Sequence, residues 1–178
     1  MTDTPETPNL QDLTFLPYLD AGEIPSELQR KIGVYAIFDE QRTLQLVDYS
    51  RDIYTSLKQH LVRQPDYCYW VKVKTIERPS RTILEEIKEA WIAENGATPA
   101  GNGEAFSQWH EPIDAKPIMT EEEKESYQKC DELGQMKLFK KVARRLEAEV
   151  LAKLEQRNVQ MEIRFNPKKK EQGLLDLK

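Results

Sequence analysis

The sequence predicts an α/β protein of the α+β type, with a small β-β-α-β-α core and a C-terminal helical and strand extension. Two alternating apolar runs separated by a turn occupy residues 32–50. Two amphipathic helical patterns flank a third apolar run over residues 51–96. Beyond residue 120 an apolar stripe recurs every three or four positions. The 178 residues suffice for one domain with an appendage.

The first strand pair follows a polar, proline-bearing lead. We expect residues 1–14 to be a disordered lead, 15–104 the α/β core, and 105–178 a loop with helices and a late strand packed on that core. "IGVYAIFD" alternates apolar faces, 39–42 supply a turn, and "TLQLVDY" returns as a second strand. These residues therefore predict a β-hairpin.

Two helices and a strand complete the predicted core. Apolar side chains recur every four positions from 53 to 61, behind Ser50 or Asp52 as the N-cap. "YCYWVKVKTI" is rich in aromatic and β-branched residues and predicts a third strand. The second helix begins after Ser80 and ends at Gly96.

The remainder begins with a stretch, residues 97–118, that has no periodicity and reads as a long surface loop. Thr120 and Glu123 have the spacing of a capping box, which starts a strongly helical region. The stripe from 136 to 154 predicts a long amphipathic helix, and residues 158–167 predict a late strand.

Composition limits the function classes. With 39% hydrophobic and 32% charged residues, the chain is typical of a soluble, folded protein, and no segment has the length of a membrane span. The net charge of −5 disfavours nucleic acid as the main partner and leaves room for a basic protein partner. Cys68 and Cys130 form no C-x-x-C or metal-spaced set, so we expect two reduced thiols.

The element order, together with short motifs, resembles the GIY-YIG nuclease domain over residues 30–104. Those motifs are the "GVY" that contains Gly33 and Tyr35, "LVDYS", His60, and the "PAGN" that ends at Asn102. By this resemblance the family hydrolyses phosphodiesters with one divalent metal ion. A strand tyrosine, a helix arginine and a metal-binding glutamate would carry out the reaction.

Several family positions are lost in this chain. The resemblance places the glycine of the second motif on Asp48, the arginine on Ser56 and the metal glutamate on Lys88. An ammonium group would then stand where a cation should bind, and serine cannot replace a guanidinium. Glu85, about one turn before Lys88, is the candidate that could restore a metal ligand. We therefore expect no catalytic residues, metal or cofactor, and no enzyme activity.

Over its whole length the chain resembles cyanobacterial and chloroplast proteins with a degenerate GIY-YIG-type fold. These relatives include a stromal assembly factor for photosystem I. The resemblance implies a non-catalytic assembly protein acting on the peripheral iron–sulfur subunit with a thylakoid-anchored helper. It also implies a cytoplasmic location, including the cytoplasmic face of the thylakoid membrane. The alternative is a metal-dependent endonuclease or nucleic-acid-binding protein that uses Tyr35 and Glu85.

Two further groups are candidate partner-binding residues. Phe106 and Trp109 are aromatic side chains in a polar loop, where they either fix the loop to the domain or offer an anchor to a partner. The polar side of the long helix is either a solvated face or a docking patch, and its basic residues are Lys137, Lys140, Lys141, Arg144 and Arg145. Tyr35 and His60 have an alternative interpretation as packed side chains.

Overall fold

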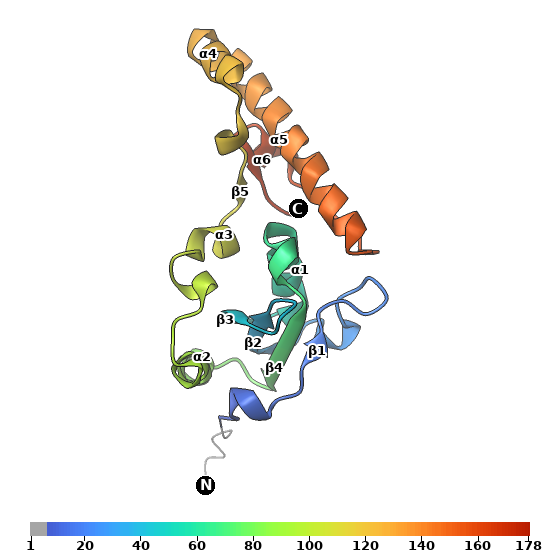
Figure 1. Cartoon of the computed structure of the whole chain (residues 1–178), viewed down its shortest axis with the longest axis vertical. Coiled ribbons are helices and arrows are strands. Elements are labelled where there is room, and N and C mark those ends of the chain that lie inside the picture. Colours follow the sequence, from blue (N-terminus) through green and yellow to red (C-terminus); the bar gives the residue numbers. More distant parts are fainter. Residues whose placement is uncertain (1–6) are drawn as a thin grey trace. The chain divides into compact units, whose positions relative to one another are not determined.

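A computed structural model describes residues 7–178 of the chain. The chain divides into two compact units, Met1–His110 (unit 1) and Glu111–Lys178 (unit 2), and each is described by itself. Figure 1 labels their helices and main strands. The structure has a four-stranded antiparallel sheet and helices, which confirms the α+β class in general terms.

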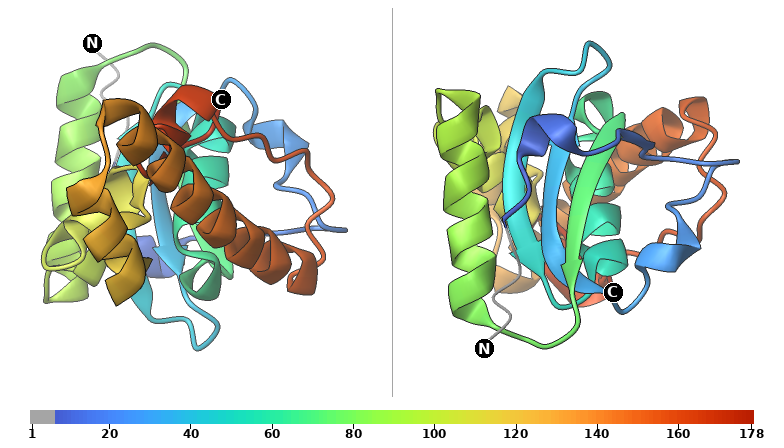
Figure 2. Two further views of the ribbon diagram at one scale, coloured as in Figure 1. Left: turned by 90° about the horizontal axis from the view of Figure 1, so that it is seen from above. Right: turned by 90° about the horizontal axis from the view of Figure 1, so that it is seen from below.

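Unit 1 is built on one sheet of order β1-β4-β2-β3, in which every neighbouring pair is antiparallel. Figure 2 shows helix α2 on one face of this sheet and helix α1 on the other. Tyr35 on the central strand β2 faces Asp48 of β3 and Val73 of β4 in the register. The elements are β1 (Leu16–Pro17), β2 (Ile32–Phe38), β3 (Leu44–Ser50), α1 (Ile53–Arg63), β4 (Trp70–Ile76), α2 (Arg81–Asn95) and α3 (Phe106–His110).

Local sequence signals explain where the two long helices of unit 1 begin and end. The Asp52 side chain accepts the amide of Thr55 at the start of α1. Ser80 caps α2 by accepting the amide of Ile83, and Gly96 ends it in the left-handed conformation with φ of 78°. Of the two residues predicted to cap α1, Asp52 is the N-cap, and the predicted caps Ser80 and Gly96 of α2 are confirmed.

The two faces of the sheet bury different side chains because neighbouring residues of a strand point to opposite sides. The α2 face is mainly apolar: alternate β2 residues such as Val34 and Ala36 pack with Leu84, Ile87 and Trp91 of α2. The α1 face carries the intervening residues, and among them is the polar side chain of Tyr35. Hydrophobic burial therefore holds α2 to the sheet, whereas the α1 face combines apolar and hydrogen-bonding contacts.

The beginning of the chain differs from the predicted disordered lead. Residues 1–6 of that lead lie outside the described residues. From there on, a 3-10 turn at Leu10–Asp12 carries a buried Leu10, whose amide donates to the Glu94 carboxylate at 2.9 Å. The indole of Trp91 also donates to the carbonyl of Pro8 at 2.9 Å. These acceptors and donors come from α2, far along the sequence, so local composition could not indicate them.

Unit 2 is mainly helical. Thr120 and Glu123 form the predicted capping box at the start of α4, and the carboxylate of Glu123 binds the guanidinium of Arg145 at 2.7 Å. Asp131 caps α5 by accepting the amide of Gly134. The elements are β5 (Ile113–Asp114), α4 (Glu121–Lys129), α5 (Glu132–Gln156), α6 (Pro167–Lys170) and β6 (Leu174–Leu175).

The structure has no strand where residues 158–167 predicted one; within the described part of unit 2, only Phe165 there makes an isolated bridge, to Leu177. The two-stranded sheet of this unit pairs β5 with β6 instead. An alternating sequence becomes a strand only where a neighbour takes up its backbone groups. Between residues 7 and 178, no helix is both long and apolar enough to cross a membrane.

Candidate functional site

A buried hydrogen-bonded chain links β2, α1 and α3 in unit 1. The hydroxyl of Tyr35 lies 2.9 Å from Nε2 of His60, and Nδ1 of His60 lies 3.0 Å from the carbonyl oxygen of Trp109. A carbonyl only accepts, so Nδ1 carries the hydrogen and Nε2 accepts from Tyr35. Arg63 also donates to the Trp109 carbonyl, at 3.1 Å. We call these four residues the Tyr35 network.

Burial keeps the Tyr35 and His60 side chains of this network uncharged. Desolvation lowers the pKa of His60 to about 3, with smaller contributions from the charges of His110 and Arg63. Desolvation also raises the pKa of Tyr35 well above its ordinary value, and the negative charge of Asp48 adds to this. At neutral pH the tyrosine is therefore protonated and the histidine uncharged. The network clamps α1 and α3 to the sheet, and Tyr35 is a poor general base.

Beside this network, at the outer strand β3, Asp48 lies between two basic side chains. Its carboxylate oxygens are 3.8 Å from Nζ of Lys88 and 3.6 Å from Nδ1 of His110. The ring of His110 stacks on that of Phe106, with 4.2 Å between centroids. The ammonium of Lys88 therefore faces the carboxylate of Asp48. Nε2 of His110 is buried without a hydrogen-bond partner.

Glu85, the candidate metal ligand, interacts with a neighbouring strand. Its Oε1 accepts from the hydroxyl of Tyr49 at 2.6 Å, and this hydrogen bond raises the pKa of Tyr49. Ser56, at the expected arginine position, donates its hydroxyl to Oγ of Ser50 at 2.7 Å. Among residues 7–178 no three His, Cys, Asp or Glu side chains are grouped so that they could hold a metal ion.

Asn102 and Gly33 have positions explained by packing. The Asn102 side chain donates to the carbonyl of Val47 at 2.7 Å and accepts its amide at 2.8 Å, as a neighbouring strand would. A β-carbon at Gly33 would overlap the backbone of Lys74 on β4, so only glycine is accommodated there. Both residues are therefore required by the sheet itself.

The predicted partner-binding aromatic residues differ in exposure. Trp109 is 2% exposed, so its ring fixes α3 to unit 1, whereas Phe106 is 51% exposed. Sequence reasoning missed a pocket of about 310 Å³ beside them, the glutamine pocket, whose lining includes Gln45, Gln64, Tyr67, Gln108 and Trp109. Only the aromatic Tyr67, two residues after Pro65, could have suggested it.

The predicted basic face of α5 is divided between internal ion pairs and exposed side chains. Arg145 binds Glu123, and Nζ of Lys140 lies 3.5 Å from a carboxylate oxygen of Glu171. The exposed members of this face are Lys137, Lys141 and Arg144.

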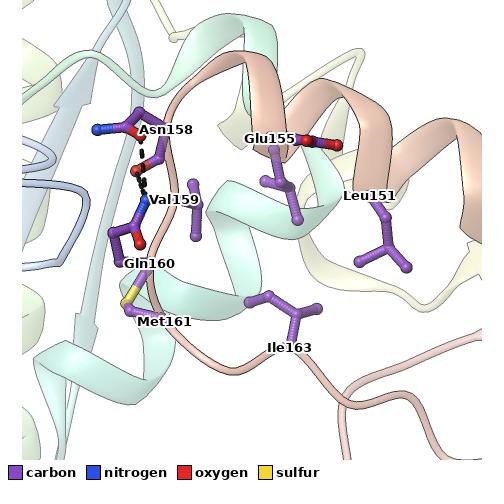
Figure 3. A pocket seen from close by; sticks show the side chains of 8 residues that line it. Leu151, Glu155, Asn158, Val159, Gln160, Met161 and Ile163 are labelled. Atoms are coloured by element: carbon purple, nitrogen blue, oxygen red, sulfur yellow. Dashed lines mark hydrogen bonds between the residues drawn. The ribbon is translucent and has the colours of Figure 1, made fainter.

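A hollow of about 340 Å³ lies at the C-terminal end of α5, in unit 2 (Figure 3). Leu151 and Glu155 of α5 line one side, and residues 158–161 together with Ile163 line the other. The side-chain amide of Gln160 donates to the side-chain oxygen of Asn158 at 3.0 Å within this lining (Figure 3). Its single charged residue is the acidic Glu155.

No family model matches the chain. It is 37% identical over 98 residues to a protein of Arabidopsis thaliana described as "Bifunctional monothiol glutaredoxin-S16, chloroplastic". The match covers 53% of this chain and 32% of the relative, so the chain spans about a third of the length of the protein it matches.

These comparisons contradict the resemblance to the GIY-YIG nuclease family. The relative is described as a glutaredoxin, so the predicted degenerate nuclease, the photosystem I assembly factor and the nuclease or nucleic-acid alternative are all corrected. The motifs that suggested the family were short, and packing accounts for them. Gly33 is needed because strand β4 lies too close for a β-carbon. Tyr35 and His60 form a hydrogen bond with each other, and Asn102 hydrogen-bonds to the outer edge of β3.

Proposed function

We propose that these residues form a non-catalytic protein-binding module that acts together with a monothiol glutaredoxin. The relative's description names a glutaredoxin and calls the protein bifunctional. This chain matches about a third of it, which leaves most of the relative for its other parts. Two modules joined in one protein are held at a high effective concentration, which favours a contact between them.

The burial of Cys68 is the observation that carries this proposal. Its side chain is 0% exposed, whereas thiol transfer needs an accessible thiolate. Cys130 is partly exposed, but it lies at the end of α4 in unit 2 and not in the unit that carries the four-stranded sheet. The strand pairs described in unit 1 are all antiparallel, whereas thioredoxin-like redox motifs lie beside βαβ units, whose strands are parallel. These features support a companion of the redox protein over the redox protein itself.

The glutamine pocket is the surface we assign to the partner. Tyr67 is 45% exposed at its rim, and Phe106 lies in the same helix as Gln108 of its lining. Exposed aromatic side chains are enriched in protein interfaces and supply much of their binding energy. The lining has no charged residue, so a neutral surface of the partner can pack there without burying an unpaired charge.

Isothermal titration calorimetry with a purified monothiol glutaredoxin tests the proposal. We expect a saturable complex that Phe106→Ala and Tyr67→Ala each weaken by about tenfold or more, as truncated interface anchors do. Leu133→Ala is the matched control because it also truncates an exposed apolar side chain, on α5, and should leave binding unchanged.

Two results would contradict the proposal. One is the absence of heat and of co-elution with the glutaredoxin. The other is glutathione-dependent disulfide reduction by this chain alone that Cys68→Ser or Cys130→Ser abolishes. Because the relative is described as chloroplastic, we infer a plastid-type compartment as the place of action.

A further inference from the structure

A second pocket in unit 1, of about 290 Å³, lies on the α2 side of the sheet, apart from the glutamine pocket. It is formed where β2 begins, where β3 ends and where α2 begins. We call it the arginine pocket; the lining residues that matter here are Ile32, Tyr49, Arg51, Ser80, Arg81 and Leu84. It shares no lining residue with the glutamine pocket or with the Tyr35 network.

The lining contains two cations and no carboxylate. Arg51 and Arg81 are both exposed, and within residues 7–178 neither guanidinium has a carboxylate within ion-pair distance. Arg81 contacts the phenol of Tyr49. Glu85 lies one turn further along α2, but its carboxylate accepts from the same phenol. In a chain of net charge −5, this pocket is therefore a local concentration of positive charge.

The walls add apolar surface and a hydroxyl donor to the two arginines. Leu84 is buried at the inner wall, and Ile32 and the ring of Tyr49 are partly buried beside it. Oγ of Ser80 accepts the amide of Ile83, which leaves its hydroxyl hydrogen to donate to a bound oxygen. A ligand that matches all of these groups has an oxyanion at one end and a compact apolar body at the other.

We propose that the arginine pocket binds a small organic anion, a carboxylate or a phosphate monoester attached to a compact apolar group. Guanidinium groups bind both oxyanions through paired N–H donors, which a lysine cannot reproduce. The volume lies near the lower end of small-molecule sites, so the apolar group is limited to about the size of one aromatic ring. The hollow of unit 2 offers the opposite charge, because its single charged residue is Glu155.

Amide NMR of the full chain, titrated separately with phenyl phosphate, phenylacetate and benzyl alcohol, tests this site. Phenyl phosphate, phenylacetate or both should shift the amides of Arg51, Ser80 and Arg81 to saturation, and the neutral benzyl alcohol should not. Which of the two anions binds identifies the headgroup. The double variant Arg51→Gln and Arg81→Gln should bind about tenfold more weakly or worse, since charge-assisted hydrogen bonds are lost.

Arg78→Gln is the matched control, because Arg78 is exposed in the loop between β4 and α2, just before Ser80 and Arg81, and lies outside the pocket lining. It should change the affinity less than about twofold, since exposed charges outside a site are screened. The proposal is overturned if neither anion saturates, if benzyl alcohol shifts the same amides as strongly, or if Arg78→Gln weakens binding as much as the double variant. Glutaredoxin binding is measured separately, so failure here leaves the proposed partner unaffected.

Discussion

The neutral state of His60 makes the stability of unit 1 depend on pH. Burial lowers the pKa of this side chain from 6.5 to about 3. As the pH falls below 6.5, His60 therefore becomes protonated in the unfolded chain but stays neutral in the folded chain. The contribution of neutral His60 to the free energy of unfolding is fully present above pH 6.5 and is lost progressively down to about pH 3.

The size of this effect follows from the width of that window. A one-proton difference is worth about 1.4 kcal/mol per pH unit, so lowering the pH from 7 to 5 should cost about 2 kcal/mol through His60 alone. A loss of this size is a large fraction of a typical domain's stability. It should therefore be easily resolved by denaturant unfolding.

Urea unfolding followed by tryptophan fluorescence measures this quantity for unit 1, because Trp70, Trp91 and Trp109 all lie in it. The comparison is between the natural chain and His60→Gln at pH 7 and pH 5. The glutamine amide can donate to the Trp109 carbonyl and accept from Tyr35, but it does not titrate. The natural chain should lose about 2 kcal/mol more than the variant. His110 is present in both proteins, so its titration largely cancels.

An equal loss in the two proteins would refute this reasoning. So would an imidazole signal of His60 that titrates near its ordinary pKa in the folded chain. Either result would mean that the ring reaches solvent and that the Tyr35 network is not closed.

Three further substitutions test other parts of the structure. Gly33→Ala should cost about 3 kcal/mol or prevent folding, because its β-carbon would overlap the backbone of β4; soluble yield and unfolding measure this. Asn102→Ala should cost about 1–3 kcal/mol in urea unfolding, because the buried amide and carbonyl of Val47 lose their partners. Glu123→Gln should lower the thermal midpoint of unit 2, because the ion pair with Arg145 is lost; circular dichroism measures this midpoint. The natural chain should itself weaken as the pH falls from 4.5 towards 2, since Arg145 lowers the pKa of Glu123 to about 2.

Local signals in the sequence were enough to predict most elements of unit 1. The alternation in residues 32–50 predicted the hairpin, and the side chains of Asp52 and Ser80 predicted both helix starts, because caps act within one turn. The strand predicted at residues 158–167 is absent. It has the right alternation, but pairing depends on neighbours that no local pattern indicates.

The candidate site was predicted less completely than the fold. The sequence singled out Tyr35 and His60, but their hydrogen bond joins residues 25 positions apart, which no local pattern reveals. The carbonyl of Trp109 that completes the network is a backbone group, so its residue type gives no signal. Lys88 was identified as a misplaced cation, and the structure shows that it faces Asp48. Side-chain type indicated which residues were unusual; three-dimensional pairing decided what each one does.

The side chain of Asn102 also bears on how molecules of this protein behave when crowded together. β3 is an outer strand, and an open strand edge invites a ladder with another copy and so aggregation. At Val47 the outward-facing amide and carbonyl are already hydrogen-bonded to the carboxamide of Asn102. A side chain offers no backbone groups to a further strand, so the hydrogen-bond ladder stops there. The adjacent Gly101 lies close against the carbonyl of Gln45, which screens the next position. These two contacts protect the β3 edge of the sheet against pairing with another copy, and neither contact uses a charged residue.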